Sequence, residues 1–137
     1  MKKTSIIVLI SSLLAMFFMN LLSNNLNFVT YLVIAISPIL LGAIYIVKGK
    51  NDGIIYNFHC SLLDTIIYTL VYGVGSYLFY RRGGYKTIVE NSLDLGSQNI
   101  AIGTVEGLGI GDLLLPFFVT LIIFYLSGRK SQRNEVK

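Results

Sequence analysis

The chain has 137 residues, of which 54% are hydrophobic and 13% are charged, and its formal net charge is +4. The charged share is about half of the ~25% usual in soluble domains, and several apolar runs are too long for a globular core. No segment alternates apolar and polar residues over ~10 positions, as membrane β-strands do. A soluble domain and a β-barrel are therefore excluded. We predict an all-α integral membrane protein in which residues 1–137 form a single domain.

Four helices are expected to cross the bilayer, over residues 5–22, 28–47, 62–79 and 110–127, with a loop at 80–109. Each apolar run approaches the ~20 residues that span a hydrocarbon core of ~30 Å. The first run follows Lys2 and Lys3 as in a signal peptide, but no small-x-small cleavage site follows it, so we expect it to be retained. Pro38 removes an amide in the middle of the second span and predicts a kink there.

Basic residues decide the predicted orientation. If the four spans alternate in direction, three basic residues, Arg81, Arg82 and Lys86, lie opposite the two termini. Eight others share the side of the termini: Lys2, Lys3, Lys48, Lys50, Arg129, Lys130, Arg133 and Lys137. Because cytoplasmic loops carry the excess of Lys and Arg, we expect both termini in the cytoplasm and a multi-pass protein of an inner (cytoplasmic) membrane. The positive charge is thus assigned to topology, and the bilayer, not nucleic acid, is the predicted contact.

The third span has one polar side. At 100° per residue, an arc of about 140° holds a set of residues that we call the polar seam. The polar seam consists of Asp64, Thr65, Tyr68, Thr69, Tyr72 and Ser76. Since hydroxyls and a carboxylate are costly in hydrocarbon, this side is expected to face protein. Two interpretations remain: the polar seam lines a path or binds a partner, or it supplies hydrogen bonds between helices. Asp64 lies near the predicted helix start, where we expect it to reach interfacial water.

The loop before the last span is long enough to carry function. We predict a short helix over Thr87–Leu95, ended by Gly96. The glycine-rich stretch at 95–111 can lie on the membrane surface or re-enter the bilayer, and we favour the surface. One cysteine, Cys60, cannot form an intrachain disulfide, and one histidine, His59, offers little to a zinc site. No metal and no cofactor is predicted.

A short motif opens the last span. Gly109, Gly111 and Asp112, with Pro116 four residues later, resemble the Gly-x-Gly-Asp element of intramembrane aspartyl peptidases of the presenilin and signal-peptide-peptidase group. The resemblance covers about ten residues and implies a catalytic role for Asp112. Such enzymes use two facing carboxylates, and Asp64 is the other carboxylate in a predicted span. The predicted topology separates the two by ~20 Å across a ~30 Å core, which is too far for a dyad.

The non-enzymatic interpretation of Asp112 is a helix cap, and we favour it. A short acidic side chain at a helix start accepts backbone amides, here those of Leu114 and Leu115, and complements the positive end of the helix dipole. No catalytic residue is therefore predicted, and the chain is expected not to be an enzyme.

Three functions follow from these observations. The first is a subunit, accessory or immunity-type protein that acts through helix–helix or loop contacts with a protein partner. The second is a small transporter-like or channel-like homo-oligomer in which the polar seam lines the path. The third is a peptidase of the Gly-x-Gly-Asp type.

Overall fold

The structure is a computed structural model, and it describes residues 3–48, 56–93 and 109–135. Four helices are long and apolar enough to cross a membrane: α1 (Lys3–Leu21), α2 (Phe28–Lys48), α3 (Phe58–Arg81) and α5 (Ile110–Glu135). A 3-10 turn, η1 (Ser23–Asn25), joins α1 to α2, and a short helix, α4 (Gly84–Leu93), follows α3. No strand occurs in the described ranges. The predicted four-helix membrane bundle is confirmed.

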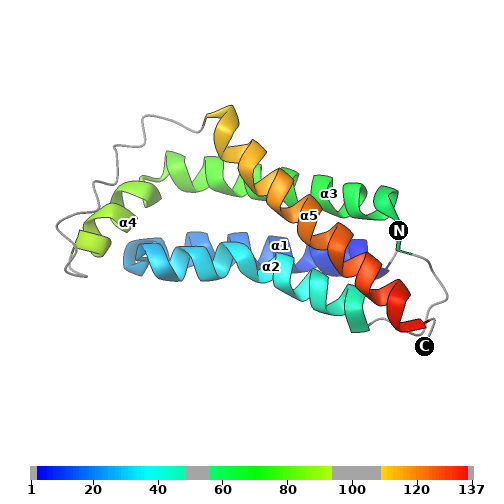
Figure 1. Cartoon of the computed structure of the whole chain (residues 1–137). Coiled ribbons are helices and arrows are strands. Elements are labelled where there is room, and N and C mark those ends of the chain that lie inside the picture. The colour runs from blue at the N-terminus through cyan, green and yellow to red at the C-terminus, as the bar shows by residue number, and fades with distance from the viewer. Residues whose placement is uncertain (1–2, 49–55, 94–108, 136–137) are drawn as a thin grey trace.

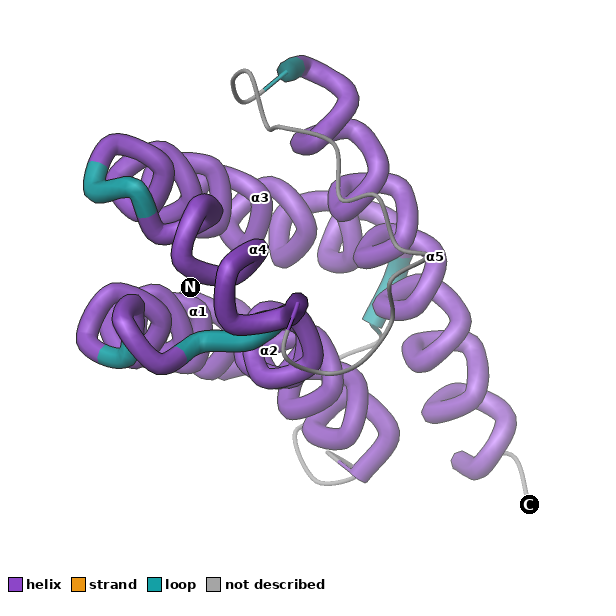
Figure 2. Tube along the Cα trace, turned by 90° about the vertical axis from the view of Figure 1, so that its left-hand side faces the viewer, coloured by secondary structure: helices purple, strands orange, loops and turns teal. Residues whose placement is uncertain are grey.

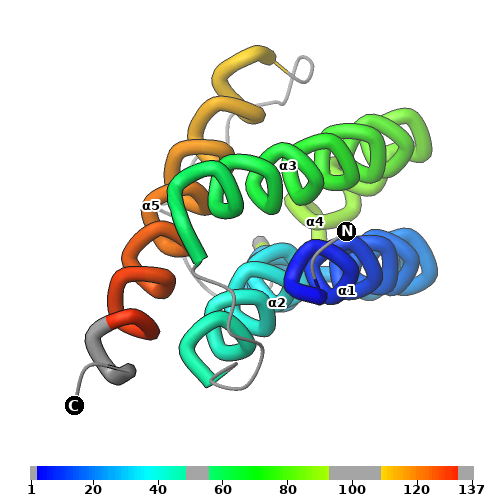
Figure 3. Tube along the Cα trace, turned by 90° about the vertical axis from the view of Figure 1, so that its right-hand side faces the viewer, coloured from blue at the N-terminus to red at the C-terminus, as the bar shows by residue number. Residues whose placement is uncertain are grey.

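The four long helices run alternately up and down, and both ends of the chain lie at the same end of the bundle (Figure 1). Viewed from that end, α1 and α5 lie on opposite sides of the pair α2 and α3 (Figure 3). α1 packs along both members of that pair, and α5 crosses both of them. The backbones of α2 and α3 therefore face each other across the interior, and side chains fill the space between them.

Three helix boundaries lie three or more residues from the predicted limits. α3 begins at Phe58, four residues before the predicted start, because the Asn57 side chain caps it by accepting the Cys60 amide at 3.1 Å. α4 begins at Gly84 and not at Thr87. α5 continues beyond residue 127 to Glu135, since its basic tail remains helical after the apolar run ends. The predicted end at Gly96 and most of the 95–111 stretch lie outside the described residues.

Pro38 lies inside α2, as predicted, and is buried. Proline has no amide to offer the Ile34 carbonyl one turn earlier. The Ser37 hydroxyl donates to that carbonyl instead, at 2.8 Å. A neighbouring hydroxyl is one of the ways in which membrane helices tolerate proline, because an unpaired carbonyl is costly in lipid.

α4 covers the end of the bundle that lies opposite the termini (Figure 2). The Asn91 amide donates to the carbonyls of Asn24 and Leu26, at 3.2 and 3.0 Å, and so ties α4 to the turn between α1 and α2. The Ser92 hydroxyl accepts the first amide of α2, from Phe28, at 2.9 Å. Ile88 is buried against residues of α1, α2 and α3. α4 is thereby fixed as a lid over one end of the bundle.

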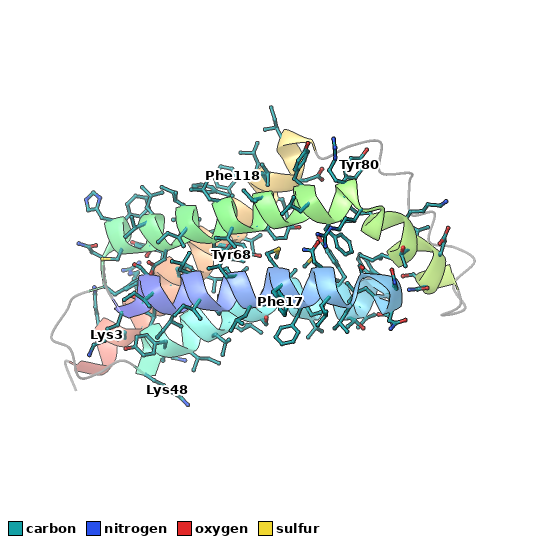
Figure 4. The ribbon with its side chains drawn as sticks, turned by 180° about the vertical axis from the view of Figure 1, so that it is seen from behind. Lys3, Phe17, Lys48, Tyr68, Tyr80 and Phe118 are labelled. Carbon is teal, nitrogen blue, oxygen red and sulfur yellow. The ribbon has the colours of Figure 1, made fainter. Side chains whose placement is uncertain are left out.

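Large apolar side chains cover the outside of the bundle. Phe17 and Phe118 point outward and are 61% and 55% exposed, whereas Tyr68 lies between the helices and is 2% exposed (Figure 4). Such a surface suits contact with lipid chains.

Candidate functional site

The polar seam of α3 faces the interior. Asp64, Thr65, Tyr68 and Ser76 are buried, and Thr69 and Tyr72 are half-buried. The opposite side of α3 is exposed and apolar, and includes Leu63, Ile66, Leu70, Val74 and Leu78. The helix is therefore oriented as its hydrophobic pattern predicts for a lipid environment.

Asp64 belongs to a cluster at the end of the bundle that holds the termini. Its carboxylate is 0% exposed and accepts the Ser5 hydroxyl of α1 at 2.5 Å and the Tyr56 hydroxyl at 2.8 Å. The expectation that Asp64 reaches interfacial water is wrong, since α3 starts earlier than predicted and carries Asp64 into its second turn.

Tyr56 joins this cluster to α5. Its backbone carbonyl accepts the Gln132 side chain at 3.0 Å, and its ring packs against Gly128. Burial and, next, the neighbouring Asp64 carboxylate raise the pKa of the Tyr56 phenol. The phenol therefore keeps its proton and donates a hydrogen bond to the Asp64 carboxylate.

A second cluster lies towards the opposite end of the bundle and consists of tyrosines. The Tyr31 hydroxyl of α2 is 2.9 Å from the Tyr72 hydroxyl of α3 and 3.2 Å from the Tyr85 hydroxyl of α4. The Tyr68 hydroxyl donates to the Ala35 carbonyl at 3.0 Å. The Tyr31–Tyr72 and Tyr68–Ala35 bonds cross the space between α2 and α3. Tyr68 and Tyr72 thus supply the interhelical hydrogen bonds that one interpretation of the polar seam predicts.

The remaining polar seam residues have a different role. The hydroxyls of Thr65 and Thr69 are buried and make no hydrogen bond within the part of the chain that the structure describes. The Ser76 hydroxyl is also buried without a hydrogen-bond partner among the described residues, and it lies next to Tyr85. Part of the polar seam is therefore bonded between helices, and part leaves polar atoms available inside the bundle.

A cavity of about 520 Å³ adjoins the tyrosines. It lies between α2, α3, α4 and the first half of α5, and is lined by Phe28, Tyr31, Leu32, Ala35, Ile36, Ile39, Tyr68, Tyr72, Tyr85, Gly111, Asp112, Leu115, Pro116 and Val119. Its size falls in the range of small-molecule sites. Five of these lining residues are aromatic, and Asp112 is the one that carries a charge.

Asp112 occupies the third position of α5, and Gly109 precedes the helix. Its carboxylate accepts the Gly109 amide at 2.8 Å, and the Asp112 amide donates to the Gly109 carbonyl at 3.1 Å. The predicted cap over Leu114 and Leu115 is therefore corrected. Asp112 reaches back to the residue before the helix, as the acidic member of a capping box does.

The two span carboxylates lie at opposite ends of the bundle. Asp64 is held by Tyr56, which packs against Gly128 of α5, while Asp112 opens the same helix. The 16 residues between positions 112 and 128 correspond to about 24 Å of helix. Asp64 and Asp112 consequently do not form a dyad within this chain.

The chain was compared with known protein families, curated proteins and solved structures. No protein family, curated protein or solved structure matches the chain. In the described ranges, no three His, Cys, Asp or Glu side chains gather as metal ligands would. The function is accordingly inferred from the chemistry of the cavity and from the exposed surface.

Proposed function

We propose that the protein binds an amphipathic organic cation in the tyrosine-lined cavity, which is the binding step of a transporter-like function. One observation carries this proposal: an apolar, aromatic cavity of about 520 Å³ has a single charged lining residue, Asp112. An apolar ligand body fits the walls, and the carboxylate selects a positive head over a negative one.

The aromatic walls support the same ligand class. The faces of tyrosine and phenylalanine rings attract cations, by about 0.5–2 kcal/mol each according to exposure. Burial raises the pKa of Tyr85, and the hydrogen bond with Tyr31 offsets part of this rise. Tyr85 therefore stays neutral at physiological pH, and Asp112 is the one acidic side chain that lines the cavity.

The cavity also orders the ligand along the membrane normal. Asp112 is exposed at the first turn of α5, whereas Val119 lines the cavity seven residues deeper, about 10 Å along the helix. A ligand with its charge at Asp112 would place its apolar body towards Ile39 and Val119. This is the orientation of an amphiphile that enters from the bilayer surface.

Tetraphenylphosphonium and tetraphenylborate test the proposal, because they match in shape and differ in charge. We expect the purified protein in neutral detergent to bind tetraphenylphosphonium saturably, at least tenfold more tightly than tetraphenylborate. Asp112→Asn should weaken binding of the cation about tenfold, which corresponds to about 1.4 kcal/mol. Titration calorimetry, with protein-free micelles subtracted, measures both affinities.

The control variant is Glu90→Gln on α4. The Glu90 carboxylate is exposed, pairs with Lys86 at 3.8 Å and does not line the cavity, so its loss should leave the affinity unchanged. Equal binding of both ions, or an unchanged affinity in Asp112→Asn, would mean that the cavity only dissolves apolar molecules and would refute the proposal.

A second function, that of a subunit or accessory protein, is favoured by α5. Of its most apolar 18 residues, 11% are buried, against 33–39% in α1, α2 and α3. A helix with so little intramolecular packing has room for a protein partner along its length. We expect a stoichiometric partner to co-purify in mild detergent, and to be lost when Phe118 and Ile122 on the exposed side are replaced by alanine. Purification of the chain alone from its native membrane would contradict this candidate.

A further inference from the structure

A groove of about 700 Å³ runs between α1 and α3. Of the helices in the bundle, α1 lies on the side opposite α5 (Figure 3). The groove is lined by Leu13, Met16, Phe17, Asn20, Leu21, Leu70, Val71, Val74, Gly75, Leu78 and Arg82. Nine of these residues are apolar or glycine, and Arg82 is the one with a charge. Arg82 is the C-cap residue that follows α3, next to the lid α4. The groove is thus apolar along its length and basic at one end.

The length of the groove matches one leaflet of a bilayer. From Leu70 to Arg81, the last residue of α3, the helix advances 11 residues, or about 17 Å, and Arg82 follows it. Half of a ~30 Å hydrocarbon core is ~15 Å. A single acyl chain that lies in the groove from mid-membrane would therefore bring its headgroup to the level of Arg82.

The predicted orientation does not account for the basic residues at this end of the bundle. Arg81 and Arg82 stand at the C-terminal end of α3 and Lys86 lies on α4, whereas Lys3 and Lys48 lie at the other end of the bundle (Figure 4). Lys86 pairs with Glu90, but within the described residues no ion pair involves Arg82. A guanidinium at the bilayer interface presents donors that match the geometry of phosphate.

Asn20 supplies a second polar group at the same end. Its side-chain nitrogen donates to the Met16 carbonyl at 2.9 Å. Its side-chain oxygen is buried and has no partner among the described residues, which is costly for a polar atom. A headgroup hydroxyl can donate to this oxygen while the phosphate contacts Arg82.

From these four features we infer that the groove between α1 and α3 binds one anionic phospholipid of the phosphatidylglycerol class. One acyl chain lies between Leu70 and Leu78, the phosphate contacts the Arg82 guanidinium, and a glycerol hydroxyl donates to Asn20. The bound lipid gives Arg82 a partner at this end of the bundle. The site is separate from the tyrosine-lined cavity and does not depend on the proposed function.

Native mass spectrometry of the full chain, with lipids of identical dioleoyl chains, tests the inference. We expect one phosphatidylglycerol to bind about tenfold more tightly than phosphatidylcholine. Arg82→Gln should abolish this preference, and Arg82→Lys should retain part of it. Arg81→Gln is the matched control, because Arg81 is adjacent, exposed and not part of the groove, so the preference should persist.

Two further measurements distinguish the contribution of the acyl chain to lipid binding from that of the headgroup. Val74→Trp fills the groove and should weaken binding of both lipids. Inorganic phosphate at millimolar concentration should not displace the bound phospholipid, since it lacks the tail. Equal losses in Arg81→Gln and Arg82→Gln would show general surface attraction and overturn the inference. Displacement by phosphate, or wild-type binding in Val74→Trp, would overturn it as well.

Discussion

Replacing Asp64 with alanine is expected to lower the free energy of unfolding by about 3 kcal/mol. The carboxylate is fully buried and accepts hydroxyls from Ser5 at 2.5 Å and from Tyr56 at 2.8 Å. Its removal leaves both hydroxyls in an apolar interior without their acceptor. Because Ser5 is on α1 and Tyr56 is held by α5, the loss loosens contacts among three helices. Unfolding in mixed micelles of rising dodecyl sulfate content, followed by far-ultraviolet circular dichroism, measures the change.

Two matched variants show whether the hydrogen bonds cause the loss. Asp64→Asn keeps one acceptor oxygen and should cost less than half as much. Ser5→Ala should cost about 1 kcal/mol in the wild type and much less in the Asp64→Ala background, because the two residues share a bond. Wild-type stability in Asp64→Ala, or additive losses in the double variant, would contradict the role assigned to Asp64.

The long helices could be predicted because a membrane span is a local property of the sequence. About 20 apolar residues suffice to define one, whatever lies beside it. The inward orientation of Tyr68 and Tyr72 follows from the 100° spacing, since lipid excludes the polar side. Helix ends are less predictable. The start of α3 depends on Asn57, and Phe58-His59-Cys60-Ser61 lacks the apolar signal by which the span was recognised.

The partners of the polar seam could not be predicted. Ser5, Tyr31, Tyr56 and Tyr85 are separated from it along the chain, and single polar residues in apolar runs show no periodic pattern. The available signal was weaker: a buried tyrosine needs a partner for its hydroxyl. The cavity could not be predicted either, because it arises from the way α5 crosses α2 and α3 (Figure 3). The angle at which two helices cross depends on how their side chains pack together. The hydrophobic pattern of a single helix does not determine this packing.

Glycine at position 84 is expected to be required for packing, and glycine at position 111 to be dispensable. A Cβ added at Gly84 would overlap the ring of Phe79, whereas nothing lies within 4 Å of a Cβ added at Gly111. Both glycines stand in the first turn of a helix, where alanine is intrinsically the better residue. Gly84→Ala should lower stability by about 2 kcal/mol, as overpacking of a core does. Gly111→Ala should leave stability unchanged or raise it by up to about 1 kcal/mol.

Gly84→Ala is expected to lower stability, unlike Gly111→Ala, because the side chains around Phe79 leave its ring no room to move. Its ring is fully buried, with ring centroids of Tyr85 at 5.2 Å and Tyr31 at 6.2 Å. A displaced Phe79 must push Tyr85 or Tyr31, and both line the cavity. Gly84→Ala should therefore also weaken binding of tetraphenylphosphonium, although residue 84 does not line the cavity itself. The micelle unfolding assay and the cation titration measure the two effects. Equal stability of the two alanine variants, or wild-type affinity for the cation in Gly84→Ala, would show that the contact of Gly84 with Phe79 does not position the tyrosines.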